Sequence, residues 1–198
     1  MNMSENLPLV LGSTSVFRKG QLERLGLAFQ TAAPDFDETP HAGESAYDTA
    51  LRLAEGKARS LAARFGAALI IGADQVAFCE GRQLGKPMNV AAAQQMLAAL
   101  SGKRIEFYSA IVLLNTATGR MQRHVDTTVV TMRTLSQAQI EAYLAREPDA
   151  VYCAGAAKSE GLGAALLEKI DSTDPNALIG LPVFRLIDFL HAEGVAVL

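Results

Sequence analysis

The sequence predicts an α/β protein with a mixed β-sheet flanked by helices. Short apolar runs typical of buried strands alternate with longer segments whose apolar residues recur at helical spacing. Two β-rich segments flank a turn, which indicates antiparallel neighbours beside the strand–helix units. No linker, internal repeat or low-complexity tract interrupts the 198 residues. We therefore expect one domain over residues 1–198.

The first elements form a strand–helix–strand unit. Residues 7–13 (LPLVLGS) form an apolar run that predicts a buried strand, and residues 16–25 follow as a helix. The helix start can be capped by any of three hydroxyl residues: Ser13, Thr14 and Ser15. Residues 29–33 predict a second strand, and the two prolines and several acids of residues 34–44 predict a loop.

The central elements are the clearest. Residues 46–65 predict a helix, because its apolar residues follow an i, i+3, i+4, i+7 pattern: Leu51, Ala54, Ala58, Leu61 and Phe65. Residues 68–72 (ALIIG) predict a central strand that ends just before Asp74 and Gln75, and residues 90–100 predict another helix.

The second half adds a pair of strands and two helices. Residues 106–116 and 125–133 predict strands that are a hairpin or neighbours. Ser136 begins a helix that reaches Arg146, with Gln139 placed for a capping box. Residues 154–163 form a glycine-rich segment, and residues 181–191 predict the last helix.

Composition excludes several classes of protein. Hydrophobic residues make up 49% of the chain and charged residues 20%, which excludes a mainly disordered chain. No apolar run approaches the ~20 residues that a bilayer requires, and the net charge of −3 argues against general nucleic-acid binding. The two cysteines, Cys79 and Cys153, lie too far apart in the sequence for a zinc ribbon or redox dithiol motif. Residues 1–8 do not resemble a secretion signal, so we expect a cytoplasmic protein.

Four segments carry polar residues that suggest a site. The segment from Ser13 to Lys19 places hydroxyls, Arg18 and free amides at a helix start, which can bind an anion, although simple capping is an alternative. Three carboxylates within four residues can hold a divalent cation or form an acidic surface turn: Asp35, Asp37 and Glu38.

Asp74 and Gln75 follow the central strand, where ligands of α/β folds tend to bind, and a carboxylate there can accept a proton or hold a metal. Lys158 and Glu160 lie beside glycines that let a ligand approach the backbone. Two further lysines join the set: Lys57 and Lys86. The helix position of Lys57 fits equally well a lysine that extends its amine to solvent.

Together these segments resemble the Maf-like nucleotide pyrophosphatase family. The matching stretches are LGSTSVFRKGQLERLGL (11–27), DFDETP (35–40), GADQV (72–76), LGKP (84–87), KSEGLG (158–163) and DPNALIGLP (174–182). They occur in the right order across nearly the whole chain.

The resemblance implies a curved mixed sheet with two lobes around a central cleft. It also implies hydrolysis of a nucleoside triphosphate between the α and β phosphates, with Mg²⁺ or Mn²⁺, and allows a homodimer. In this family's pattern Asp74 matches the proton acceptor, and Glu38 matches a metal-binding acid beside it. The phosphate groups are matched by Ser13, Arg18, Lys57, Lys86 and Lys158.

Three residues match the branch of the family that resembles 7-methyl-GTP pyrophosphatases: Phe17, Gln75 and Glu160. The pyrimidine branch, which acts on dTTP and UTP, resembles a pattern with Arg, Thr or Ser, and Gln at these positions. The chemistry agrees, because a carboxylate can accept from guanine N1–H and its amine, and an aromatic face stabilises the methylated, cationic ring.

The sequence departs from the family pattern at Val16, at Lys19 and at Ala157, where an aromatic is usual. The absence of that aromatic leaves open a broader nucleotide pyrophosphatase, and a pyrimidine (dTTP/UTP) pyrophosphatase is a further alternative. A nucleotide-binding regulator of cell division is the alternative from another functional class.

Overall fold

The computed structural model describes residues 7–198. The expectation that residues 1–8 are not a secretion signal therefore falls largely on residues 1–6, which lie outside the described residues. Within them the chain forms two compact units. Unit 1 holds the chain up to Gln75, Ser109–Asp126 and Asp174–Leu198, and unit 2 holds Val76–Tyr108 and Thr127–Thr173. The expected cleft between two lobes stays a prediction.

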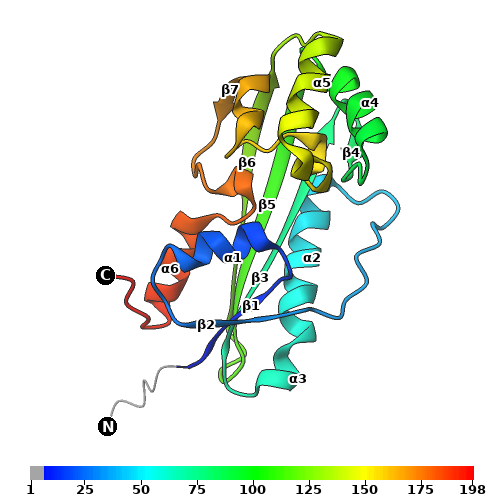
Figure 1. Cartoon of the computed structure of the whole chain (residues 1–198). Helices are drawn as coiled ribbons and strands as arrows, with labels where there is room; N and C mark the ends of the chain where they lie inside the picture. Colours follow the sequence, from blue (N-terminus) through cyan, green and yellow to red (C-terminus); the bar gives the residue numbers. More distant parts are fainter. Residues whose placement is uncertain (1–6) are drawn as a thin grey trace. The chain divides into compact units, whose positions relative to one another are not determined.

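The described residues form one open, mixed sheet of seven strands with the order β2-β1-β3-β5-β6-β7, and β4 pairs with β3. The predicted α/β class with a mixed sheet flanked by helices is therefore confirmed (Figure 1). The strands are β1 (Leu9–Gly12), β2 (Phe29–Ala32), β3 (Leu69–Cys79), β4 (Arg82–Leu84), β5 (Arg104–Asn115), β6 (Met121–Met132) and β7 (Leu167–Asp171).

The α-helices are α1 (Val16–Glu23), α2 (Ala46–Ser60), α3 (Ala62–Phe65), α4 (Val90–Leu100), α5 (Gln137–Arg146) and α6 (Val183–Ala192). Short 3-10 helices lie at Pro148–Tyr152, Ala154–Ala156, Leu162–Leu166 and Ala177–Ile179. No helix in the part of the chain that the structure describes combines the length and apolarity needed to cross a membrane.

Side-chain caps explain where the helices begin. The hydroxyl of Ser15, not that of Ser13 or Thr14, caps α1 by accepting from the backbone N–H of Arg18. Asn89 caps α4 in the same way. The expected capping box at α5 is present, with Ser136 and Gln139 bonding to each other's backbone N–H groups.

Two element predictions were wrong in detail. The expected helix over residues 46–65 breaks at Leu61, whose N–H bonds to the Ala58 and Arg59 carbonyls, so α2 and the short α3 are separate. The central strand was expected to stop at Gly72 but continues to Cys79, because β4 pairs with its end through a turn at Glu80 and Gly81. Both turn residues have positive φ, the conformation that suits a two-residue hairpin.

The sheet of unit 1 is covered on both faces. Alternate residues of β1 and β3 pack with α1 and α6 in one apolar core: Leu9, Leu11, Leu22, Leu69, Ile71, Leu186 and Leu190. On the other face α2 lies so close that a Cβ at Gly72 would be 2.1 Å from the carbonyl oxygen of Ala54. Figure 1 shows α2 running alongside these strands. This close approach brings α2 side chains against β3.

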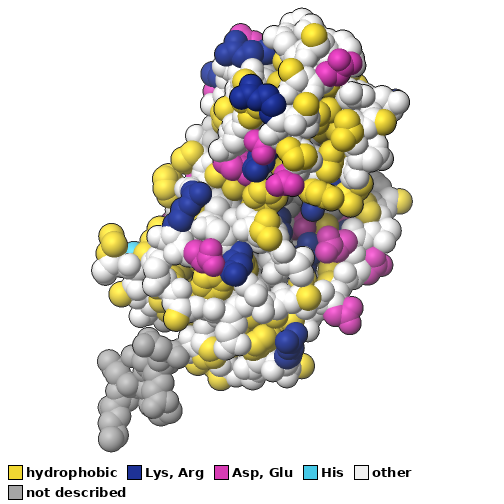
Figure 2. Space-filling model, in the orientation of Figure 1, with side chains coloured by type: hydrophobic (Ala, Val, Ile, Leu, Met, Phe, Trp, Pro, Cys, Tyr) yellow, Lys and Arg dark blue, Asp and Glu magenta, His cyan; other side chains and the backbone are white. Residues whose placement is uncertain are grey.

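Charged side chains of both signs are interspersed on the face of the described residues drawn in Figure 2.

Candidate functional site

Unit 1 gathers several of the candidate residues at one edge of its parallel strands. β1 pairs in parallel with β2 and with β3, and the paired residues at the carboxyl ends are Gly12, Ala32 and Gly72. Ser13, the acidic loop and Asp74 follow these positions directly. Asp74 and Gln75 lie inside β3, not beyond its end as expected, but β3 has there passed the end of β1. The placement at a carboxyl edge therefore holds for the parallel part of the sheet.

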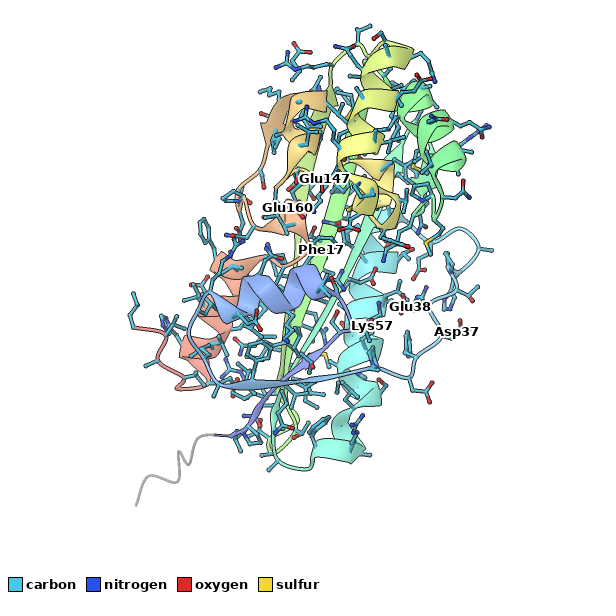
Figure 3. The ribbon with its side chains drawn as sticks, viewed as in Figure 1. Phe17, Asp37, Glu38, Lys57, Glu147 and Glu160 are labelled. Carbon is cyan, nitrogen blue, oxygen red and sulfur yellow. The ribbon has the colours of Figure 1, made fainter. Side chains whose placement is uncertain are left out.

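A buried lysine joins two of the predicted acids. Lys57 Nζ lies 2.6 Å from Asp74 Oδ1 and 2.9 Å from Glu38 Oε2. The side chains of Lys57 and Asp74 are 8% and 10% exposed, whereas that of Glu38 is 57% exposed. In Figure 3 the labelled Lys57 on α2 and Glu38 on the acidic loop lie side by side. Lys57 is therefore not a lysine that extends its amine to solvent.

Strand alternation sends Asp74 and its neighbour Gln75 to opposite faces of the sheet. Gly72 and Asp74 face α2, which is why Asp74 meets Lys57. Gln75 faces the other way and donates from Nε2 to the carbonyls of Ala177 and Leu178, each at 3.0 Å. The amide nitrogen of Gln75 is thus engaged with the protein's own backbone.

The loop that precedes α6 is held by side chains from three elements. Ser109 Oγ accepts from Gln75 Nε2 at 2.8 Å and donates to the Ala177 carbonyl at 2.7 Å. Gln21 Nε2 donates to the Asn176 carbonyl at 2.8 Å. The sequence reasoning missed Gln21 and Ser109. A signal existed for both: Gln21 lies four residues before Leu25 and so on the apolar side of its predicted helix, and Ser109 interrupts an apolar strand.

Arg18 connects this loop to β3 next to Asp74. Its Nε donates to the Gly180 carbonyl at 2.9 Å and its Nη1 to the Ala73 carbonyl at 3.0 Å. Burial lowers the pKa of Arg18, while the charges of Asp74 and Glu38 act in the opposite direction. A guanidinium has five N–H donors, so donors remain for an anion such as phosphate after these two bonds.

Hydrogen bonds separate the roles of the carboxylates in the acidic loop. Asp37 Oδ1 accepts from the backbone N–H of Thr39 at 2.9 Å and from its hydroxyl at 2.7 Å, and these bonds lower the pKa of Asp37. Arg52 donates to both oxygens of Glu44, at 2.7 and 2.8 Å. Asp37 and Glu44 thus shape the loop, and Glu38 is the acid that reaches Lys57.

The Glu44–Arg52 pair predicts a pH dependence of stability. The Arg52 hydrogen bonds lower the pKa of Glu44 from its ordinary 4.5 to about 2. Since this pKa is depressed in the folded state, the stabilisation is complete above pH 4.5 and is lost as pH falls towards 2. We expect Glu44→Gln to lower the free energy of unfolding at pH 6 and to flatten its decline between pH 4.5 and 2.5, as urea titrations at each pH would measure. An equally steep decline in the variant would contradict this assignment.

Unit 2 carries the other candidate residues. Lys158 Nζ lies 2.9 Å from Glu147 Oε1, and the backbone N–H of Leu162 donates to Glu147 Oε2 at 3.1 Å. These two bonds lower the pKa of Glu147, a residue that the sequence reasoning missed and for which the chain gives no clear signal. Glu147 and Glu160 are labelled in Figure 3. Glu160 and Lys86 have exposed side chains.

A model of the Maf-like protein family matches residues 8–193. This chain belongs to the Maf-like family. The resemblance drawn from the scattered motifs is therefore confirmed over most of the chain.

Curated relatives of this Maf-like protein share a name. A Neisseria gonorrhoeae protein named 7-methyl-GTP pyrophosphatase is 72% identical over 196 residues, which are 99% of this chain and 100% of the relative. Proteins of the same name from Chromobacterium violaceum and Nitrosospira multiformis are 55% and 47% identical. Each match covers 96% of this chain, and 98% and 95% of the respective relative.

The donor set of this Maf-like protein fits a divalent metal that is shared with a phosphorylated ligand. Residues 7–198 contain no group of three or more His, Cys, Asp or Glu side chains placed to hold a metal ion. Glu38 and Asp74 supply two carboxylates around one point, which Lys57 Nζ bridges. Mg²⁺ is commonly bound through one or two carboxylates together with substrate phosphates, not by a protein cage.

Proposed function

We propose that this Maf-like protein is a nucleoside triphosphate pyrophosphatase that hydrolyses 7-methyl-GTP to 7-methyl-GMP and pyrophosphate. The observation that carries the proposal is the match, over nearly full length, to relatives named 7-methyl-GTP pyrophosphatase. Such an activity removes a modified nucleotide before it can enter RNA. The cluster of buried Lys57 and Asp74 with the more exposed Glu38 suggests how the chemistry proceeds.

Asp74 is the proton acceptor in this mechanism. Its Oδ1 accepts from Lys57, so we assign the proton of the attacking water to Oδ2. The water oxygen attacks the α-phosphorus, and the bond breaks between that phosphorus and the oxygen that bridges the α and β phosphates. The electron pair of the broken bond leaves with pyrophosphate. Mg²⁺ or Mn²⁺ held by Glu38 and Asp74 would neutralise charge on the phosphate oxygens.

Fixed cations supply the remaining stabilisation of charge. Phosphoryl transfer is catalysed mainly by positioning and by neutralising the phosphate oxygens. Arg18 is fixed by two backbone carbonyls, and Lys57 by two carboxylates, so both cations are oriented before the substrate binds. Ser13, Lys86 and Lys158 complete the proposed phosphate contacts. Lys158 exchanges its partner Glu147 for phosphate in this scheme.

Phe17 and Glu160 are the proposed base readers. The methylated guanine ring is cationic, and an aromatic face stabilises a cation by ~0.5–2 kcal/mol. Phe17 is half-buried on α1 and Glu160 is exposed, so each has surface to offer a ligand. Gln75 acts differently, because its amide nitrogen holds the loop that contains Ala177. We assign it an indirect effect on base preference through that loop.

A substrate panel tests the proposed function. We expect pyrophosphate release with Mg²⁺ or Mn²⁺ to be fastest for 7-methyl-GTP among 7-methyl-GTP, GTP, dTTP, UTP, CTP and ITP. Comparable rates for several of these would favour a broader enzyme, the alternative that Ala157 supports. Faster turnover of dTTP or UTP would reject the assigned substrate. No release from any nucleotide would reject the enzyme and favour the nucleotide-binding regulator.

Exchange of the two base readers gives a second prediction. We expect Phe17→Arg with Glu160→Gln to lower the ratio of kcat/KM for 7-methyl-GTP to that for UTP by at least ~10-fold. The cationic arginine repels the methylated ring, and the amide no longer repels the carbonyl oxygens of uracil. Glu168→Gln, which neutralises an exposed glutamate of β7, is a matched control. An unchanged ratio in the double variant would show that other contacts select the base.

The relatives' shared name implies a small nucleotide substrate for this chain. The homodimer and the cytoplasmic location expected from the sequence remain proposals. Light scattering of the purified protein would test the dimer, and fractionation of the source cells would test the location.

A further inference from the structure

Gly56 lies where a glycine is costly to a helix. It is a buried residue in the interior of α2, and glycine is a poor helix former because its backbone loses more freedom on folding. A Cβ at Gly56 would lie 2.2 Å from Cζ of Phe36 and 2.4 Å from its Cε1 and Cε2. The tip of the aromatic ring therefore rests directly on the helix backbone. Any side chain at position 56 would push it away.

This contact lies beside the cluster of Lys57, Asp74 and Glu38. Gly56 immediately precedes Lys57, and Phe36 comes two residues before Glu38, whose Oε2 lies 2.9 Å from Lys57 Nζ. Lys57 is buried but Glu38 is more than half exposed, so solvent screens the Glu38 end of the pair and the ion pair alone holds the loop only weakly. The ring of Phe36 adds apolar contact at the point where the loop meets the helix. The contact and the ion pair thus join the same two segments.

A separate anchor holds the far end of the acidic loop. Arg52 Nη2 donates to the Thr39 carbonyl at 3.1 Å and to Glu44 Oε2 at 2.8 Å. This anchor acts after Glu38 in the chain, whereas Phe36 acts before it. The two anchors therefore bracket Glu38.

We propose that Phe36 is a positioning residue: seated on Gly56, its ring holds the Glu38 carboxylate beside Lys57 and Asp74 and so sets the affinity of these acids for a divalent metal. The proposal rests on the proposed function for its metal, but the seating of the ring does not. Phe36 acts through Glu38 and has no contact with the reacting atoms in this scheme.

The test is a double-mutant cycle of Phe36→Ala, Gly56→Ala and their combination. Binding of Mn²⁺ in the presence of pyrophosphate, followed by the electron spin resonance of free Mn²⁺ and corrected by the same titration without protein, gives the metal affinity. Cleavage after Glu38 by endoproteinase Glu-C, identified by peptide mass, reports release of the loop without any need for activity. Gly20→Ala is the matched control, because Gly20 lies within α1 and a Cβ there would meet no atom within 4 Å.

We expect each single variant to raise the Kd for Mn²⁺ by about tenfold, the lower end of the effect of removing a group that orients a metal ligand. Cleavage after Glu38 should accelerate in both. The double variant should have no higher Kd for Mn²⁺ and no faster cleavage than Phe36→Ala, because the methyl group added at position 56 then has no ring to displace. Gly20→Ala should match the original protein in both measurements. Phe36→Leu, which keeps apolar contact with α2, should give a smaller effect and replaces any variant that does not fold.

Two results would overturn the proposal. One is an unchanged Kd for Mn²⁺ in folded variants whose loop is cleaved faster. The other is an additive effect of the two substitutions, since this would mean that ring and glycine act separately. If the original protein releases no pyrophosphate while the variants lose Mn²⁺ binding and protection as expected, the proposed function fails and the positioning role of Phe36 stands.

Discussion

Asp74→Asn should lower kcat for pyrophosphate release by at least ~100-fold, the usual scale for a lost general base. The amide has nearly the shape of the carboxylate, and its oxygen can still accept from Lys57. It cannot take a proton from water, and it is a weaker metal ligand. We therefore expect a fall in kcat that is larger than any change in KM for the nucleotide.

Folding and a neighbouring acid provide the controls for Asp74→Asn. The substitution leaves Lys57 with Glu38 as its remaining ion-pair partner, so the variant should fold, with a lower melting temperature. Asp35→Asn removes an exposed carboxylate of the acidic loop and should leave kcat unchanged. A folded Asp74→Asn variant with near-normal kcat would remove Asp74 from the role of proton acceptor.

Gly72→Ala should have the largest effect on stability. Its Cβ would lie 2.1 Å from the Ala54 carbonyl oxygen, 2.9 Å from the Ala58 Cβ and 3.0 Å from the Ala58 nitrogen. Two of these atoms are helix backbone, which cannot move aside as a side-chain tip can, so α2 must shift. We expect the free energy of unfolding to fall by ~1–3 kcal/mol, the range found for overpacked cores. Urea titration would measure it.

The same substitution should also lower activity in protein that remains folded. A shift of α2 away from β3 lengthens the 2.6 Å contact between Lys57 Nζ and Asp74 Oδ1. Gly20→Ala is the comparison, because it should raise stability by ~0.5–1 kcal/mol through helix propensity alone. A Gly72→Ala variant as stable as the original would show that α2 and β3 can separate at little cost.

Local signals predicted most of the elements. Caps and apolar spacing gave α1, α4 and α5 within a few residues, since these signals lie within one helical turn of each boundary. The course of β3 beyond Gly72 was not predicted, because partner strands and not local propensity extend it to Cys79. β4 and β7 were missed for a similar reason, being short and defined by pairing with β3 and β6.

The candidate site was predictable as a set of residues but not as an arrangement. The sequence named Lys57, Asp74 and Glu38. The family resemblance singled out Glu38, but the composition of the acidic segment gave no physical reason to prefer it to Asp37, because the two differ in the hydrogen bonds of a loop. It also could not show that Gln75 turns to the face opposite Asp74, because the strand boundary was placed before both. Lys158 was named without its partner Glu147, which another element supplies.

The bonds around the Ala177 carbonyl bear on any attempt to transplant base preference between enzymes of this family. Gln75 and Ser109 both donate to that carbonyl, and Gln21 holds the neighbouring carbonyl of Asn176. Replacing Gln75 alone with the shorter threonine would leave the Leu178 carbonyl without its donor and the loop without one of its supports. A graft of a foreign residue at position 75 must therefore replace the supporting polar residues as well if the loop is to keep its hydrogen bonds, so positions 21, 75 and 109 have to be exchanged together.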